Sequence, residues 1–408
     1  MSVALVFAVA VLAQPPENST LRAEAERKLA AHDVAGALAD YEKLAQLDPA
    51  AAEYQDQIGF ILAATGRMTD ALPFFKRAIE IDPKFAQAWF HEGVAMMMSQ
   101  RAANGIADLK RAVSLTPGNP EYRFRLGSAY VAAGQDGAAI PEFNQAAKGS
   151  PGNAAIWEAL GLACERQGKL AMARDAYRKA LTLDPKNNTI RDNYGYTLVN
   201  TGDPAAGRRE FERVLQSDPN NVRVQVNLGY SYIASGSYQA AIQHLSNVVR
   251  QHADNAGAQY DLGVAYKQSD DLVHAKEHLE QAVKLDSTLP EAHYTLGLVY
   301  VDGGQSVEAI EQFRAAVRQK PNDAASWFEL GTLLKGAGDS NGAIEALRHT
   351  VVLDDTDAGA FNTLGLLLKR KGDIEGSTQA FAKAAALRDA EAKKKAKALA
   401  DGSARVPK

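Results

Sequence analysis

The chain has 408 residues, with 45 Lys or Arg against 49 Asp or Glu and a formal net charge of −4. This balance argues against a nucleic-acid partner, because such a surface needs clustered basic residues. The single cysteine, Cys164, excludes an intramolecular disulfide and a zinc site built on several cysteines. We expect no bound cofactor, and we expect Cys164 to lie in the core.

The first thirteen residues differ in composition from the rest of the chain. Residues 3–13 form an uninterrupted apolar run of eleven residues, followed by Gln14-Pro15-Pro16. Eleven residues are too few for a membrane-spanning helix, which needs about 20, so no integral membrane span is expected. The run is typical of a secretory signal cleaved after Ala13, although no Lys or Arg precedes it. An apolar strap on the first repeat is the alternative.

A glycine then recurs every 34 residues without interruption. A fixed period of this length indicates a helical solenoid, in which each repeat is one supersecondary unit. The recurring glycines are Gly59, Gly93, Gly127, Gly161, Gly195, Gly229, Gly263, Gly297, Gly331 and Gly365.

Other positions keep the same frame and predict two short helices in each repeat. A small residue follows each glycine after twelve positions, as at Ala173, and a large apolar residue follows after sixteen, as at Tyr177. A proline often stands 24 positions after the glycine, as at Pro185, where it ends the second helix. A second set of glycines marks the turn between the helices: Gly66, Gly134, Gly168, Gly202, Gly236, Gly304, Gly338 and Gly372.

This pattern resembles the tetratricopeptide repeat family, most closely at Trp157-Glu-Ala-Leu-Gly161 and Trp327-Phe-Glu-Leu-Gly331. The resemblance implies an all-α fold: a right-handed superhelical solenoid of about eleven helix-turn-helix repeats over residues 18–391. Residues 392–408 are expected to form a basic capping extension and tail, with the last helix running to about Ala400. The family serves as a general protein-binding scaffold.

The resemblance also implies that the first helix of each repeat lines a concave groove. Amide side chains can pair with the backbone of an extended peptide, and tyrosines supply contact area with a polar tip. Ordinary scaffold packing is the alternative for the same side chains. The predicted peptide-binding residues are Asn193, Tyr196, Asn227, Tyr230, Tyr260 and Tyr294.

A secondary apolar patch is predicted nearer the N-terminus, formed by Phe90, Met97, Met98 and Phe124. Methionine adapts to irregular partners and is frequent on promiscuous binding surfaces. Met97 and Met98 are expected to face the groove, and loose core packing is the alternative.

One segment matches a catalytic pattern. His274, Glu277 and His278 spell H-x-x-E-H, the inverted zincin motif, in which histidines four residues apart on a helix chelate zinc. Ala275 and Leu279 are the packing residues of this helix, which places the histidines on its outer side. No third ligand is evident, so we interpret the motif as a chance match.

The favoured hypothesis is a non-catalytic scaffold that binds a protein or an extended peptide, exported to the periplasm or envelope of a bacterium. A cytoplasmic regulatory or assembly adaptor with a misassigned start is the alternative. A metal-dependent enzyme using the H-x-x-E-H segment is a remote third. The sequence predicts no oligomeric state.

Overall fold

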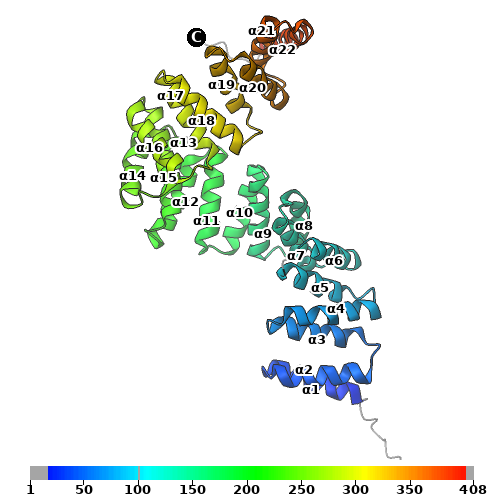
Figure 1. Ribbon diagram of the computed structural model, residues 1–408. Coiled ribbons are helices and arrows are strands. Elements are labelled where there is room, and N and C mark those ends of the chain that lie inside the picture. Colours follow the sequence, from blue (N-terminus) through cyan, green and yellow to red (C-terminus); the bar gives the residue numbers. More distant parts are fainter. Residues whose placement is uncertain (1–16, 100–101, 401–408) are drawn as a thin grey trace, which may run out of the picture. The chain divides into compact units, whose positions relative to one another are not determined.

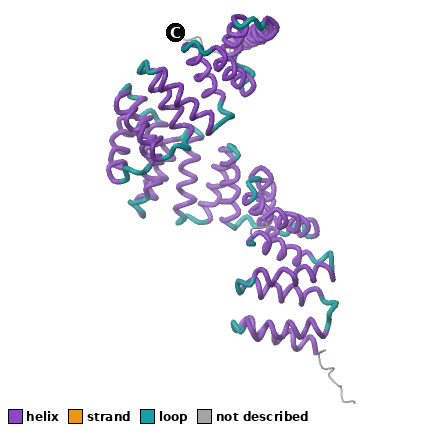
Figure 2. The backbone as a smooth tube through the Cα atoms, in the orientation of Figure 1, coloured by secondary structure: helices purple, strands orange, loops and turns teal. Residues whose placement is uncertain are grey.

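The computed structural model describes residues 17–99 and 102–400, and every regular element in these residues is an α-helix (Figures 1 and 2). Consecutive helices pack as antiparallel pairs in the 34-residue frame, which confirms the all-α solenoid of helix-turn-helix repeats. The predicted signal-like segment 1–13 and the tail 401–408 lie outside the described residues. The predicted handedness of the superhelix stays a prediction.

The chain forms two compact units, and the first ends at Gly202. Its helices are α1 (Glu17–Ala30), α2 (Val34–Leu47), α3 (Ala52–Ala64), α4 (Met68–Ile81), α5 (Ala86–Met98), α6 (Ala102–Leu115), α7 (Pro120–Ala132), α8 (Asp136–Gly149), α9 (Ala154–Arg166), α10 (Leu170–Leu183) and α11 (Asn188–Asn200). We call this part unit 1.

Unit 2 begins at Asp203. Its helices are α12 (Pro204–Ser217), α13 (Val222–Ala234), α14 (Tyr238–Gln251), α15 (Ala256–Gln268), α16 (Leu272–Leu285), α17 (Pro290–Asp302), α18 (Ser306–Gln319), α19 (Ala324–Gly336), α20 (Ser340–Leu353), α21 (Ala358–Arg370) and α22 (Ile374–Ala400). Helix α22 ends where the sequence predicts, at Ala400.

The recurring glycine of each repeat allows its two helices to approach closely. A Cβ atom added to Gly161 in α9 would lie 2.6 Å from Cε1 of Tyr177 in α10, and the Tyr177 side chain is fully buried. Since real Cβ atoms do not approach other atoms this closely, the contact requires a glycine. Cys164, on the next turn of α9, is buried in the same core cluster, as predicted.

The turn between paired helices has one residue in the left-handed region. All eight predicted turn glycines have positive φ, from +67° at Gly168 to +92° at Gly202. This conformation suits glycine because other L-residues clash there. Among the residues that the structure describes, two repeats depart from the rule: His32 and Asp270 occupy the same turn position with φ of 61° and 63°.

Asparagine and aspartate begin most first helices by capping them. The side chains of Asn153 and Asn187 accept hydrogen bonds from backbone N–H groups in the first turns of α9 and α11. The second helices end two positions before the frame proline: α10 stops at Leu183, Asp184 is its C-cap and Pro185 follows. Within the described residues no helix has both the length and the apolar character of a membrane span.

Candidate functional site on the first helices

A pocket of about 280 Å³ lies in unit 2 among α15, α17 and the start of α19. We call it the Tyr260 pocket. It is lined by Tyr260, Pro290, Glu291, Tyr294, Thr295, Lys320, Asp323, Ala325 and Ser326.

The repeat frame brings the two tyrosines of this pocket together. Tyr260 and Tyr294 are 34 residues apart, each three positions before its frame glycine, so they occupy equivalent places on α15 and α17. The Tyr294 ring packs edge-on against Phe313, with centroids 5.7 Å apart. Burial raises the pKa of Tyr260, and a hydrogen bond from Thr295 opposes that shift. Both phenols are therefore neutral groups that can donate and accept hydrogen bonds.

The charged residues around the Tyr260 pocket are already paired or used as caps. Lys320 Nζ lies 3.3 Å from Glu291 Oε1. Asp323 caps α19 by accepting hydrogen bonds from the Ser326 backbone N–H at 2.9 Å and from Ser326 Oγ at 2.5 Å. The pocket therefore presents neutral hydroxyl groups and tyrosine rings beside charges that are already satisfied, the chemistry that suits a peptide backbone and a medium-sized side chain.

The structure brings together two of the six predicted peptide-binding residues, Tyr260 and Tyr294. Asn227 and Tyr230 are half-buried on α13 of unit 2. Asn193 and Tyr196 are half-buried on α11, in unit 1. A joint role for the two asparagines stays a prediction. Thr295 occupies the frame position of Asn193 and Asn227, two before the glycine, so the groove pattern could have found it. Ser326 stands at a frame position that is apolar or tyrosine in the other repeats, which gave no such signal.

The predicted secondary apolar patch is largely part of the core. Phe90, Met97 and Phe124 pack against the core cluster of α6 to α10, whereas Met98 is 68% exposed. Met97 departs from the expected groove position, because its Cγ lies 3.1 Å from where a Cβ of Gly105 in α6 would be. The small frame residue Gly105 leaves the space that Met97 occupies.

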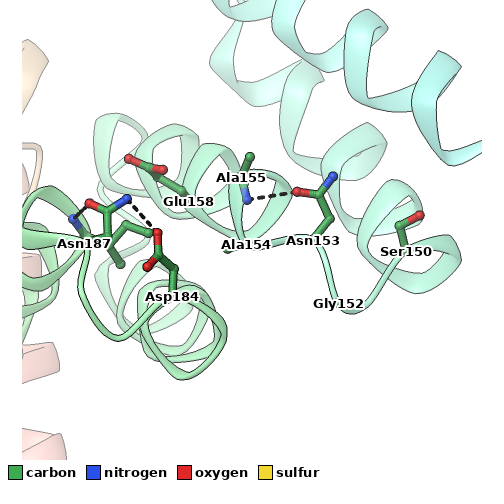
Figure 3. Close-up of a pocket in the computed structure, with 9 residues that line it drawn as sticks. Ser150, Gly152, Asn153, Ala154, Ala155, Glu158, Asp184 and Asn187 are labelled. Atoms are coloured by element: carbon green, nitrogen blue, oxygen red, sulfur yellow. Dashed lines mark hydrogen bonds between the residues drawn. The ribbon is translucent and has the colours of Figure 1, made fainter.

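A second pocket, of about 660 Å³, lies in unit 1 where α9 and α11 begin (Figure 3). We call it the Glu158 pocket. Its walls include the carboxylates of Glu158 and Asp184, while Asn187 Nδ2 donates to Asp184 Oδ2 at 3.3 Å. Burial, and then the charge of Asp184, raises the pKa of Glu158. No Lys or Arg lines this pocket among the described residues.

The H-x-x-E-H histidines are held by neighbours in the repeat. His274 Nδ1 lies 2.7 Å from Asp271 Oδ2, and His278 Nδ1 lies 2.8 Å from Gln259 Oε1. The Tyr266 ring stacks on both imidazoles. Burial lowers the pKa of His278. In the part of the chain that the structure describes, no three His, Cys, Asp or Glu side chains gather as metal ligands do.

Sequence reasoning also missed a buried hydrogen-bonded pair in unit 1. Asp56 in α3 is fully buried, and its Oδ1 lies 2.8 Å from Nδ1 of His91 in α5. Asp56 occupies the frame position that Phe90, Phe124, Tyr260 and Tyr294 hold in other repeats. Acids also stand at this position in Glu158 and Asp192, so the frame gave no signal that singled out the Asp56–His91 pair.

Family comparisons match four parts of the sequence to helical repeats. The tetratricopeptide repeat domain of cytochrome c-type biogenesis protein H matches residues 145–259. Three general tetratricopeptide repeat models match residues 22–84, 232–296 and 290–323. No curated protein sequence matches the chain.

One solved structure supports the same fold, and two others are more distantly similar. A tetratricopeptide repeat protein from Parabacteroides merdae has a TM-score of 0.56 at 14% identity, covering 61% of this chain and 98% of that one. The human IFIT1 dimer with m7Gppp-AAAA has a TM-score of 0.46 at 16% identity, over 83% of this chain and 90% of that one. MamA is 29% identical over 40% of this chain and 96% of its own, with a TM-score of 0.35.

Proposed function

The chain is a tetratricopeptide repeat protein, and from this premise we propose that it binds an extended segment of a partner protein along the first helices of unit 2. The Tyr260 pocket is the centre of the proposed site. Proteins of this fold generally act as non-catalytic scaffolds, and we extend that role to this chain. The expectation of no nucleic-acid partner is part of the same proposal.

The observation that carries this proposal is the convergence of Tyr260 and Tyr294 on one pocket beside Thr295 and Ser326. Tyrosine combines a large apolar face with a hydroxyl group and is enriched among residues that dominate binding energy. An extended peptide carries one donor and one acceptor at each residue, and these need partners when they are buried. Neutral hydroxyl groups at fixed positions supply such partners.

Site-specific photo-crosslinking tests this proposal. A photoreactive phenylalanine analogue in place of Tyr294 should capture a partner protein in the native cell, and mass spectrometry should locate the crosslink in one extended segment. The matched control places the same analogue at Val307, which is 71% exposed on the second helix α18. Equal capture at both positions would contradict a site on the first helices.

The match to a cytochrome c-type biogenesis protein favours a second candidate, an adaptor that holds another protein during its assembly. That match covers residues 145–259, which reach from α8 into α15. The two candidates differ in the bound state of the partner. An assembly adaptor should capture its partner only before the partner matures, so a pulse-chase experiment combined with the Tyr294 crosslink distinguishes them.

Export to the periplasm or cell envelope remains our proposal for the location, with a cytoplasmic adaptor as the alternative. It rests on the apolar run at residues 3–13. Residues 1–20 fused to a reporter that is active only outside the cytoplasm should give a signal. A native protein that retains Met1 would contradict cleavage after Ala13.

A further inference from the structure

The carboxylate of Asp56 carries one oxygen atom that lacks a partner. Asp56 is 0% exposed, and its Oδ1 bonds to His91 Nδ1 at 2.8 Å. Its Oδ2 is buried and has no hydrogen-bond partner among the described residues. Buried polar atoms nearly always have a partner, so an unpaired one indicates a missing water, ion or ligand. Asp56 Oδ2 can therefore accept a hydrogen bond from a group outside the chain.

Aromatic rings lie around the imidazole that is bonded to this carboxylate. The His91 imidazole lies 5.2 Å from the Phe60 ring and 5.6 Å from the Phe90 ring, measured between centroids. Phe60 lies one helical turn beyond Asp56 in α3 and is 46% exposed. We call Asp56, Phe60, Phe90 and His91 the Asp56 site. A carboxylate beside ring faces favours a cation over an anion, since both groups attract positive charge.

No Lys or Arg of the described residues forms an ion pair with Asp56; its one ionic partner there is His91. The same chemistry recurs elsewhere on the first helices. The Glu158 pocket contains two carboxylates and no basic side chain. Asp261, next to Tyr260, has no ion pair in the described part of unit 2, and burial raises its pKa to about 7. Lys320, at the Tyr260 pocket, is held by Glu291.

We propose that the Asp56 site, in unit 1, binds the ammonium or guanidinium group of a basic segment of a partner protein. The proposed peptide site at the Tyr260 pocket lies in unit 2, so the two sites are tested separately. The cation donates a hydrogen bond to Asp56 Oδ2 and lies against the Phe60 ring. Because nearly half of the Phe60 side chain is exposed, its ring can turn toward solvent and admit the cation.

Calorimetric titration of the full chain with two synthetic decapeptides at low salt tests this inference. One peptide alternates Ala with Lys and the other alternates Ala with Glu. The Ala-Lys peptide should bind at least ~10-fold more tightly than the Ala-Glu peptide. Asp56→Asn should weaken Ala-Lys binding by about 10-fold. The matched control is Glu42→Gln, which removes one negative charge from an exposed position of α2 and should leave binding unchanged.

Equal binding of the two peptides, or equal affinity of the Asp56→Asn and Glu42→Gln variants, would overturn the inference. If circular dichroism shows that Asp56→Asn does not fold, Phe60→Leu decides in its place, because Phe60 is partly exposed and its ring contributes to the Asp56 site. Full-strength Ala-Lys binding by Phe60→Leu would also overturn the inference.

Discussion

Gln225 Nε2 donates a hydrogen bond of 2.7 Å to the backbone carbonyl oxygen of Pro219, six residues earlier. The side chain four positions before the frame glycine makes the same contact in eight consecutive repeats. Each of these side chains carries an N–H group, and each joins a first helix to the loop that precedes it. The donors are Trp89, Arg123, Trp157, Arg191, Gln225, Gln259, His293 and Trp327.

Removing this donor without changing side-chain size should destabilise the chain modestly. Gln225→Met keeps the length of the side chain but leaves the Pro219 carbonyl to water. A net cost of ~0.5–1.5 kcal/mol in the free energy of unfolding is expected. Gln55 stands at the same frame position without a hydrogen bond of this kind in the described residues. In urea denaturation Gln55→Met should therefore have the free energy of unfolding of wild type. If both variants lost the same free energy of unfolding, the Gln225–Pro219 hydrogen bond would not be the cause of the loss.

Glu92 should make the stability of unit 1 depend on pH. It occupies the position before the frame glycine, which is leucine in most repeats, and it is buried. Burial, followed by the charge of Asp108, raises its pKa to about 7, and burial raises the pKa of Asp108 to about 6. Since the folded-state pKa lies above the unfolded value, stability is complete below the unfolded pKa and is lost as pH rises through about 7.

Glu92→Gln should accordingly raise the melting temperature more at pH 8 than at pH 5, with a gain in unfolding free energy of roughly 1–3 kcal/mol at pH 8. Glu42→Gln, at an exposed position of α2, serves as the control and should not change the pH profile. If the melting temperatures of Glu92→Gln and wild type changed in parallel between pH 5 and pH 8, Glu92 would not be the source of the pH dependence.

The frame glycines should tolerate no side chain. A Cβ atom on Gly229 would lie 2.5 Å from Cγ of the buried Leu245. Gly229→Ala should therefore cost ~1–3 kcal/mol, the typical cost of overpacking. Gly336 is also helical, but a Cβ there meets nothing within 4 Å. Gly336→Ala should be neutral or stabilising by up to ~1 kcal/mol. Gly229→Ala should melt at a lower temperature than Gly336→Ala. Equal melting temperatures would show that Gly229 is not needed for close contact with Leu245.

Replacing Asp270 by glycine should stabilise the chain. Its φ of 63° places it in the left-handed region that glycine occupies at Gly236 and Gly304. Asp270→Gly should relieve this strain and raise stability by up to about 1 kcal/mol. Asp254 lies in a loop with negative φ, so Asp254→Gly should lower stability slightly. A melting temperature for Asp270→Gly below that of wild type would contradict the assignment of strain.

The sequence alone predicted what depends on the 34-residue period. The contact of Gly161 with Tyr177 and the positive φ of Gly168 follow from positions within one repeat. The same period placed Tyr260 and Tyr294 on equivalent turns, and the structure brings them into one pocket. These relationships are local, so a periodic pattern fixes them.

Contacts between different residue types at one frame position were not predictable in this way. Trp157, Arg191 and Gln225 belong to different chemical classes, and only the structure reveals their shared N–H contact. The Asp56–His91 pair joins residues 35 positions apart on adjacent first helices, where interhelical geometry decides which side chains meet. The division into two units at Gly202 also has no counterpart in the repeat pattern.

The central claim is that a partner segment binds in the Tyr260 pocket. Its most direct test compares the dissociation constants of wild type and of a double variant of the two pocket tyrosines for the segment that is captured at Tyr294. Tyr260→Phe with Tyr294→Phe keeps both rings and removes both hydroxyl groups. Tyr238→Phe, at the start of α14, is the matched control. We predict that the double variant binds about 10-fold more weakly, since each hydrogen bond lost to the partner is worth ~0.5–1.5 kcal/mol, while the double variant stays folded and the affinity of the control stays at the wild-type value. Full-strength binding by the double variant would show that the Tyr260 pocket is not where the partner binds.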